Sequence, residues 1–539
     1  MFKKILRLYN TVRYLKIKQI VWRFINLFPR IIFWTHKYPT IIDSPKNYFF
    51  IAREGITKDY KTFTFLNESL KLKEVGWDNA NNSRLWNYNL HYFEFLLTNN
   101  KIEDELDLQY QLIENWIEMN PFKNGTGWEP YPTSLRIINW IKWHWTTNKL
   151  SEKAKVSLWN QVLWLSINLE YHLMGNHLFV NAKALLFAAV FFNQNKESKI
   201  FKKANAIVKS ELDRQFLSDG AHFELSPMYH SSAMEDLLDI INIGSNLPAL
   251  FPLKMFKEKY LKGMYWLKTM IYNNEELSHF NDCANEIAPT FSEIEKYAKK
   301  LDLKRQSRQL SKFNFHQKSG FIVFKDISSH LIADFGKVGP DYLPGHAHAD
   351  TLSFELAIKG NRVIVNSGTS IYSNSEERRS QRGTSAHSTV QIDYQNSSDV
   401  WSSFRVGRRA NTFDLKTGKN KNSLFFSASH DGYKNLNNSP IHKRSFNLNK
   451  NTWTILDQIS GKGNQIVSRF YLHPAVSIRR HELGFVLSKG IIDLAFMKFK
   501  TTMITKIINT NYSDRFGYST SNKCILVKTI SPNKIELKI

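Results

Sequence analysis

The sequence turns from polar to apolar at Gly345-His346-Ala347-His348-Ala349-Asp350-Thr351-Leu352-Ser353-Phe354-Glu355-Leu356, where two histidines and a carboxylate stand at alternate positions before an apolar run. The apolar run predicts a β-strand. Because alternate side chains of an extended segment share one face, His346, His348 and Asp350 are expected to point into one pocket. Two imidazoles in one pocket suit proton transfer, metal binding, or one of each. A polar strand edge with solvated histidines is the alternative interpretation.

The chain around this stretch shows two different sequence patterns. From about residue 84 to 300, apolar residues recur at three- and four-residue spacing between turn signals, which predicts a succession of helices. After about residue 313, short β-branched and aromatic runs alternate with turn residues, as in an antiparallel β-sandwich. We therefore expect a multidomain α and β protein, with a basic N-terminal segment (1–83), a helical toroid or solenoid (84–305) and an antiparallel β domain (313–539). The expected helices include 106–119, 134–145, 159–174, 178–192, 198–216, 233–243 and 256–271.

The composition favours an anionic partner. The chain of 539 residues carries 73 Lys and Arg against 48 Asp and Glu, a formal net charge of +25. A positive field attracts polyanions, namely nucleic acid, anionic lipid or acidic polysaccharide, although Lys-rich surfaces also serve solubility alone. Aromatic residues make up 14% of the chain, and aromatic rings both fill cores and line sugar-binding clefts. Two cysteines, Cys283 and Cys524, allow no disulfide framework beyond one bridge.

In the N-terminal stretch, basic and apolar residues alternate. Ile5–Ile32 could form a basic amphipathic helix that makes peripheral contact with an anionic membrane, but docking on the next domain is the favoured role. No uncharged run has the length of a signal-peptide core, and no run is long and apolar enough to span a bilayer. From these patterns the compartment stays open between the cytoplasm and the cell envelope.

Two polar clusters lie in the helical region. The first, Gly175-Asn176-His177-Leu178 followed by Asn181, falls at a helix–helix junction, where Asn176 and His177 can donate hydrogen bonds into a cleft. Helix capping by Asn176 is the alternative, and the favoured one for this motif alone.

The second cluster centres on Tyr229. It stands between His222 and His230 in a turn that leads into a helix near Ser231, so its hydroxyl could exchange a proton with a substrate. A tyrosine whose ring packs and whose hydroxyl bonds locally is the alternative.

Taken together, the motifs resemble the heparinase II/III-like polysaccharide lyases, a group that also takes in oligo-alginate lyases. The resemblance covers most of the chain after about residue 84, and it implies an N-terminal incomplete (α/α) toroid followed by a C-terminal antiparallel β-sandwich. By the same analogy the implied compartment is the periplasm. The motifs are Arg84-Leu85-Trp86-Asn87-Tyr88-Asn89-Leu90-His91-Tyr92-Phe93, Tyr131-Pro132-Thr133-Ser134-Leu135-Arg136-Ile137-Ile138-Asn139-Trp140, Gly175–Leu178, Glu224–His230, Phe280-Asn281-Asp282, His346–Leu356 and Ser385–Val390.

The family's chemistry is β-elimination at a uronic acid in an acidic polysaccharide or oligosaccharide. A base removes the C5 proton, fixed donors stabilise the charge that grows on the carboxylate, and an acid protonates the leaving oxygen at C4. By resemblance, Asn176 and His177 neutralise the carboxylate, Tyr229 is the acid with the base role also open to it, and His346 is the partner base. Arg136 and Arg405 could bind a substrate carboxylate through their guanidinium groups, with an internal ion pair for Arg136 and plain surface charge as the alternatives. The expected substrate contacts are Arg136, His230, Tyr88, His91 and Arg405. Nucleic acid is not an expected partner.

The resemblance also implies one structural divalent cation, a zinc ion between the β-sheets. His348 and His387 match two of the family's ligands. The third is an Asp in a Val-Asp-Ser-Gly context, and this chain has Asn366 there, in Val365-Asn366-Ser367-Gly368. Since a neutral amide is a poor zinc ligand, the site is expected to be empty, weakly bound or completed by another residue.

Two other functions remain open at this stage. A glycoside hydrolase on the same scaffold would need two carboxylates about 5–5.5 Å or about 6.5–9.5 Å apart, and Glu224 and Asp282 are the candidates. A non-catalytic protein that binds glycans or assembles capsule or surface polysaccharide would need neither an acid nor a base.

Overall fold

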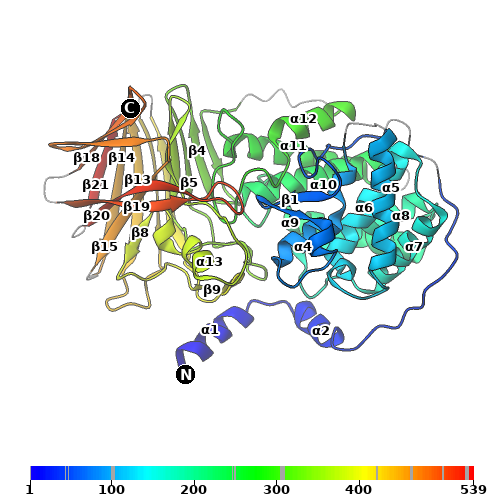
Figure 1. The fold of residues 1–539 in the computed structure, drawn as a ribbon. Coiled ribbons are helices and arrows are strands. Elements are labelled where there is room, and N and C mark those ends of the chain that lie inside the picture. The colour runs from blue at the N-terminus through cyan, green and yellow to red at the C-terminus, as the bar shows by residue number, and fades with distance from the viewer. Residues whose placement is uncertain are drawn as a thin grey trace.

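The computed structural model describes residues 2–538 except 43, 46–47, 99–102, 246, 248–250, 304–309, 421–422, 462–464, 500–502 and 529–532. Figure 1 shows a helical half beside a half built of strands, with α1 and α2 on the underside of both. The chain enters through these two helices and runs around the helical half before joining it.

The helical half contains one short hairpin, β1 (Thr62–Phe65) and β2 (Glu68–Lys71), and then a succession of helices within the described ranges. The helices are α3 (Leu72–Val75), α4 (Arg84–Tyr92), η1 (Glu94–Leu96), α5 (Glu103–Met119), η2 (Thr126–Trp128), α6 (Pro130–Thr147), α7 (Glu152–Ile167), α8 (Gly175–Phe191), α9 (Lys199–Gln215), α10 (Pro227–Ser245), α11 (Leu253–Met270) and α12 (Phe291–Lys300).

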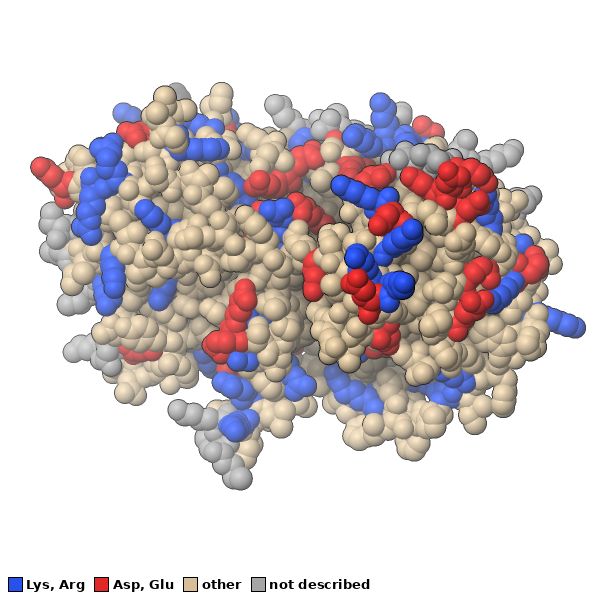
Figure 2. Space-filling view, viewed as in Figure 1, with Lys and Arg blue, Asp and Glu red and all other residues tan. Residues whose placement is uncertain are grey.

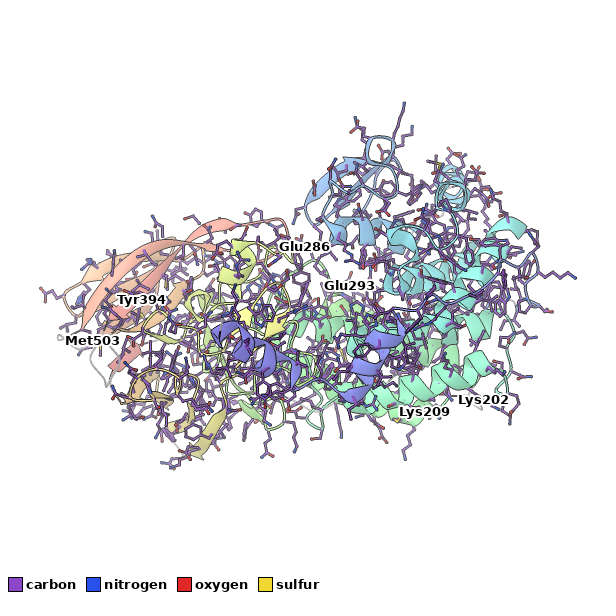
Figure 3. All side chains as sticks on the ribbon, turned by 90° about the horizontal axis from the view of Figure 1, so that it is seen from below. Lys202, Lys209, Glu286, Glu293, Tyr394 and Met503 are labelled. Carbon is purple, nitrogen blue, oxygen red and sulfur yellow. The ribbon has the colours of Figure 1, made fainter. Side chains whose placement is uncertain are left out.

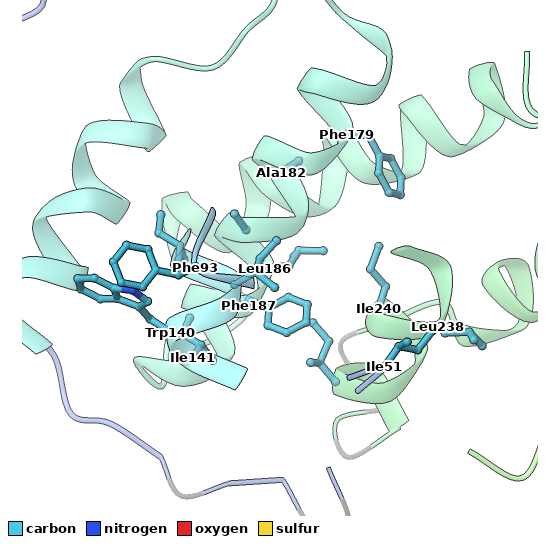
Figure 4. Packing of buried hydrophobic residues seen from close by; sticks show 14 of the residues in the cluster. Ile51, Phe93, Trp140, Ile141, Phe179, Ala182, Leu186, Phe187, Leu238 and Ile240 are labelled. Carbon is cyan, nitrogen blue, oxygen red and sulfur yellow. The ribbon is translucent and has the colours of Figure 1, made fainter. Parts of the chain in front are cut away.

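These helices form an inner and an outer layer, as in an incomplete (α/α) toroid. The inner helices α4, α6, α8 and α10 pack successively against one another. Every residue of α8 from Leu178 to Phe191 is buried, whereas α9 buries one face at three- and four-residue spacing. Figure 4 shows Phe93, Trp140, Leu186 and Ile240 converging from several of these segments.

The helix boundaries differ most from the sequence prediction in α7, which begins at Glu152 and not at residue 159, and in α10. Helix α7 ends at Ile167, before the predicted Met174, because the backbone N–H of Glu170 donates to the Asn181 side chain and the chain turns there. Helix α10 begins at Pro227, earlier than predicted, since proline is favoured in the first turn of a helix.

The second half consists of two antiparallel sheets, as the sandwich prediction required. Among the described residues one sheet has the order β11-β12-β13-β14-β21-β18-β17-β16, and the other has the order β19-β20-β15-β7-β6-β5-β4-β3 with β8 paired to β15. The elements are β3 (Phe313–His316), β4 (Phe321–Lys325), β5 (Ser329–Asp334), β6 (Phe354–Ile358), β7 (Asn361–Val365), α13 (Glu376–Gln381), η3 (Thr384–Ala386), β8 (Val390–Ile392), β9 (Val400–Trp401), β10 (Arg405–Val406), β11 (Thr412–Lys419), β12 (Ser423–His430), β13 (Ile441–Asn449), β14 (Thr452–Ser460), β15 (Ile466–Leu472), β16 (Ser477–His481), β17 (Gly484–Lys489), β18 (Ile492–Phe499), β19 (Ile504–Tyr512), β20 (Thr520–Lys528) and β21 (Asn533–Lys538).

Aromatic rings hold the two sheets together. The Phe354 and Phe446 ring centroids are 5.3 Å apart, and those of Phe324 and Trp453 are 5.5 Å apart, in each case from opposite sheets. Edge-to-face packing of this kind adds to the burial of apolar surface. The sandwich core is therefore dry and aromatic.

The outer face of the β3–β7 sheet packs against the helical half. Side chains alternate along β4, so Ile322 and Phe324 enter the sandwich core while Phe321 and Val323 face α11. The Phe321 ring lies 5.8 Å from the Trp266 ring of α11. This apolar seam sets the two halves beside each other and thereby positions the loops that project from each.

The N-terminal segment forms two helices instead of the single helix predicted over Ile5–Ile32. They are α1 (Phe2–Val12) and α2 (Ile17–Ile25). The Gln19 amide donates to the carbonyl oxygens of Leu173 and Tyr342, so α2 docks on the body of the protein. None of the helices in the described ranges is long and apolar enough to cross a membrane.

Candidate active site

The stretch that holds His346 and His348 is a loop of turns and not the expected extended segment before the strand. Strand β6 begins only at Phe354, and the preceding residues form turns in which Leu352 has a φ of 62°. Asp350 accepts the backbone N–H of Asn281 at 3.4 Å. The two histidines therefore converge because the loop wraps around one carboxylate.

That carboxylate belongs to Asp282, which lies between α11 and α12 and is completely buried. It accepts hydrogen bonds from His346 Nδ1 at 2.8 Å and from His348 Nε2 at 2.8 Å. Arg378 of α13 donates to it through both terminal nitrogens, with Nη2 at 2.6 Å. Burial alone would raise the pKa of Asp282, but the Arg378 charge and these hydrogen bonds hold that pKa well below its usual value.

An ionised Asp282 sets the tautomer of His346. Because a carboxylate only accepts hydrogen bonds, His346 must carry its proton on Nδ1, which leaves the lone pair of Nε2 free to take a proton. The His346 ring lies 4.1 Å from the Tyr229 ring, centroid to centroid. Tyr229 is in the first turn of α10, so side chains from both halves of the protein meet here.

The Tyr229 hydroxyl is a proton donor in this setting. It lies 2.9 Å from the Tyr372 hydroxyl. Burial, followed by the neighbouring Tyr372 and Asp282, raises the pKa of Tyr229 well above its usual value. The phenol therefore keeps its proton at neutral pH and is ready to give it to a strongly basic leaving group.

Asn176 and His177 lie at the start of α8, where backbone N–H groups and the helix dipole favour negative charge. Asn176 does not cap this helix, as the alternative interpretation required, because the cap position is Met174. The Asn176 amide instead donates to the Tyr131 hydroxyl at 3.5 Å, and the His177 ring lies 4.5 Å from the Tyr131 ring. Met174 itself has φ 66° and ψ −157°, a strained backbone that turns the helix start outward.

Glu170 controls the charge of His177. Its carboxylate lies 3.1 Å from His177 Nδ1, and its other oxygen accepts from Asn181 at 3.1 Å. Burial opposes the charged imidazole, but the Glu170 carboxylate outweighs it and raises the pKa of His177. The imidazole remains 41% exposed, so a cationic His177 can meet an anion from solvent. This interaction stabilises the fold fully below the unfolded pKa of about 6.5, and the stabilisation is lost as pH rises through the folded pKa.

The two groups of residues are connected through Leu343 and Glu224. Leu343, three residues before His346, packs so closely on Gly175 that a β-carbon there would lie 2.3 Å from its Cδ2 atom. The buried carboxyl of Glu224 feels the charges of both His346 and His177, and burial raises its pKa. Figure 2 shows the surface hollowed between the two halves.

Three of the expected substrate contacts lie in the core of the helical half. The Arg136 guanidinium stacks on Trp116 at 3.8 Å and donates to Gln161. His91 accepts from the Trp116 indole, and His230 accepts a backbone N–H while its other nitrogen faces the Gly263 carbonyl. All three side chains have no exposed surface, so a polysaccharide cannot touch them, and we leave them out of the proposed substrate site.

The other two expected contacts flank the cluster. Tyr88 donates to Glu129, and its ring lies 6.4 Å from Tyr92, which packs in turn against Tyr131. Arg405 is exposed and stacks on Trp401, and its neighbour Phe404 lies 5.7 Å from the His346 ring. Both remain candidates for substrate contact.

Four residues of the cluster lacked a role in the sequence analysis. Arg378 sits in the arginine-rich run 376–382, and Tyr131 opens a quoted motif, so weak signals existed for these two. Glu170 and Tyr372 had none, because each gains its role only from a partner distant in the chain.

The residues at the expected metal site do not fit a structural zinc. Since His348 Nε2 donates to Asp282, His387 Nε2 donates to His348 Nδ1 at 3.2 Å. The buried Nδ1 of His387 is the one nitrogen of the two imidazoles without a hydrogen-bond partner. The Asn366 amide is used by the protein, its oxygen accepting from Ser388 and its nitrogen donating to a backbone carbonyl. Zinc then has two neutral ligands, fewer than the three or four it requires. Within the described ranges no cluster of three His, Cys, Asp or Glu could hold a metal ion.

Family models match nearly all of the chain. The model described as heparinase II/III N-terminus matches residues 78–309, and that described as heparinase II/III-like, C-terminal, matches residues 308–534. The chain belongs to the heparinase II/III-like family. The resemblance inferred from the motifs is thus confirmed.

Two curated relatives of this heparinase II/III-like chain are described as heparin-sulfate lyases. The protein from Bacteroides stercoris is 26% identical over 352 residues, which cover 59% of this chain and 48% of the relative. The protein from Pedobacter heparinus is 27% identical over 325 residues, covering 55% and 46%. The chain therefore spans about half the length of the curated relatives it matches.

Solved structures share the fold of the heparinase II/III-like chain. A crystal structure of heparinase III has a TM-score of 0.65 at 17% identity, covering 84% of this chain and 76% of that one. A heparan sulfate lyase HepC mutant from Pedobacter heparinus has a TM-score of 0.60 at 17% identity, with coverages of 90% and 84%. The toroid followed by a β-sandwich is common to these proteins and to this one.

Replacing Glu170 by Gln should lower the pKa of His177, because burial then acts without the opposing carboxylate. His177 should lose its positive charge at a lower pH than in the unmodified protein, as followed by the NMR shift of its ring protons. Glu118→Gln, at an exposed Lys153 partner, is the matched control and should leave the titration unchanged. An identical His177 titration in Glu170→Gln would contradict the assigned cause.

Replacing Asn366 by Asp should create the missing third zinc ligand. After incubation with zinc and dialysis, this variant should retain about one ion per chain, whereas the unmodified protein should retain far less. Asn361→Asp, at the start of β7, the strand that ends just before Asn366, provides the control. Stoichiometric zinc in the unmodified protein, measured by elemental analysis, would show that the two histidines suffice.

Proposed function

We propose that this heparinase II/III-like protein is a polysaccharide lyase that cleaves a uronic-acid-containing anionic polysaccharide by β-elimination. The observation that carries the proposal is the meeting of Tyr229 and His346 at 4.1 Å beside the anion-favouring start of α8. Tyr229 offers a proton donor and His346 a proton acceptor, and the start of α8 offers positive potential for a carboxylate. β-Elimination at a uronate requires these three functions together.

The first step is removal of the C5 proton of the uronate. His346 takes this proton on Nε2, because Nδ1 is committed to Asp282. The electron pair moves toward the sugar carboxylate, where Asn176 donates a hydrogen bond and cationic His177 supplies charge. The helix start contributes further positive potential.

The second step is departure of the C4 oxygen. The C4–O bond breaks as the C4–C5 double bond forms, and Tyr229 gives its hydroxyl proton to the leaving oxygen. The resulting phenolate accepts the hydrogen bond of Tyr372 until His346 returns the C5 proton to it, which restores both groups. No water is consumed, and the product is an unsaturated sugar end.

Support for a glycosaminoglycan as substrate comes from the relatives, whose descriptions name heparin sulfate, and from the net charge of +25. The hydrolase alternative is weakened by Asp282. That carboxylate is buried and already accepts hydrogen bonds from Arg378 and two histidines, so it cannot activate a water molecule beside a sugar. A panel of acidic polysaccharides distinguishes the functions, because a lyase product absorbs ultraviolet light, a hydrolase yields reducing ends without absorbance, and a binder yields neither.

Tyr229→Phe should abolish elimination, because Tyr372, the neighbouring tyrosine, lies farther from His346, with ring centroids 5.8 Å apart against 4.1 Å for Tyr229. Substrate binding, measured by calorimetry, should stay nearly unchanged, since the ring and its packing remain. Tyr394→Phe, at an exposed tyrosine of the β half, is the control and should retain full activity. Near-normal ultraviolet product formation by Tyr229→Phe would remove this residue from the mechanism.

Asn176→Ala should slow turnover by about 10²–10³, the range for loss of one donor to a developing oxyanion. The fold should persist, because the Asn176 amide makes one long hydrogen bond and does not cap α8. The ratio of kcat in variant and unmodified protein measures the effect. An unchanged kcat would leave His177 and the helix start as the sole carboxylate stabilisers.

A further inference from the structure

The N-terminal strap, residues 4–34, concentrates the exposed apolar surface of the molecule. Half of the large hydrophobic side chains that are exposed in the described part of the chain lie within it. A patch of this density marks an interaction surface in most soluble proteins. The exposed residues are Ile5, Leu6, Leu8, Tyr9, Val12, Ile17, Val21, Phe24, Ile25, Leu27, Phe28, Ile31 and Phe33.

The outward side of the strap is more apolar than that of an ordinary surface helix, although Trp22 of α2 also packs inward on the Tyr171 ring at 4.5 Å. In α2 the buried residue is Gln19, 1% exposed, whose amide donates to the carbonyls of Leu173 and Tyr342. Phe24 and Phe28, at 64% and 73% exposure, point away from the protein. An ordinary surface helix would bury the apolar side chains and expose the polar one.

Polar contacts also anchor α1 through its inward side. Arg7 pairs with Asp399 at 2.9 Å, and the Trp401 indole donates to the Thr11 hydroxyl at 3.2 Å. Asp399 and Trp401 belong to the β half, whereas Leu173, a partner of α2, belongs to the helical half. The strap is thus held across both halves while its apolar side stays uncovered.

The charge of the strap has one sign. The first 42 residues contain no Asp or Glu and nine basic residues. Two of these flank α2 at its edge, Lys16 over the Tyr342 ring at 3.7 Å and Lys18 over the Tyr171 ring at 4.0 Å. The nine are Lys3, Lys4, Arg7, Arg13, Lys16, Lys18, Arg23, Arg30 and Lys37.

We propose that the strap binds the surface of an anionic lipid bilayer, with the outward side chains of α1 and α2 inserted among the lipid headgroups. An apolar helix face rimmed by Lys and Arg matches such a surface in both hydrophobicity and charge. Figure 3, seen from below, shows α1 and α2 side by side on the near face of the molecule, where one plane can meet both.

A second copy of the chain is the less suitable occupant. A two-fold interface through the strap would bring the same patch of both copies together. Seven positive charges would then face seven, with no acidic residue in either strap to offset them. Anionic lipid removes this repulsion.

Membrane contact would also set the position of the active site. The strap touches Tyr342, four residues before His346, and Leu173, three residues before Asn176. The cleft is therefore held near the bilayer surface. The lipid proposal itself does not depend on the proposed lyase activity.

The test uses the full chain and sedimentation with vesicles. Binding should be strong with mixed phosphatidylglycerol and phosphatidylcholine, weak with phosphatidylcholine alone, and reduced by salt. The double variant Phe24→Ser and Phe28→Ser should bind about tenfold more weakly or worse. The control, Ile327→Ser with Ile491→Ser, removes two apolar side chains that are almost fully exposed in the β half and should bind normally.

Two results would overturn the proposal. One is equal sedimentation of the unmodified chain with neutral and anionic vesicles, or no sedimentation with either. The other is a dimer in solution, seen by light scattering, that Phe24→Ser with Phe28→Ser converts to monomer while vesicle binding is unchanged. Thermal unfolding at the same temperature in every variant establishes that folding is intact.

Discussion

A buried carboxylate joins the two halves of this protein at the candidate active site. Asp282 comes from the loop between the last two helices of the toroid, whereas Arg378, His346 and His348 come from the β half. Removing one partner of a buried ion pair costs about 3–5 kcal/mol, because the other charge is left without compensation. The same contact that couples the halves therefore also orients His346, and neither function can be lost without the other.

The site separates charged from neutral groups by environment. Burial keeps the Tyr229 phenol protonated, while the Glu170 carboxylate raises the pKa of His177 against the same effect of burial. The two pKa values are thus shifted by different causes: burial away from water acts on Tyr229, and a neighbouring carboxylate acts on His177. The strained backbone of Met174, φ 66°, is part of this arrangement, because it presents the start of α8 to the cleft.

Family motifs served both packing and chemistry, and the sequence did not distinguish them. Arg136 and His91 belong to motifs as specific as those of His346, yet they fill the toroid core around Trp116. The reason is that a motif records which residue is required and not what it touches. In the same way Asn366, read as a weak metal ligand, turns out to hold the loop before β8 by its own hydrogen bonds.

Periodicity and composition were sufficient to predict that helices come first and strands follow, because burial of apolar faces at spacings of 3.6 and 2 residues is a local property of the chain. The motifs were sufficient to predict the family, and they pointed to Tyr229, His346, Asn176 and His177, whose catalytic roles remain a proposal. Folding in three dimensions determined the rest. The pairings of Asp282 with Arg378 and of Tyr229 with Tyr372 span 96 and 143 positions, and no local pattern encodes contacts between segments that distant. The outward turn of the apolar side of α2 was likewise hidden, since an amphipathic pattern shows that a helix has two faces but not which of them the protein covers.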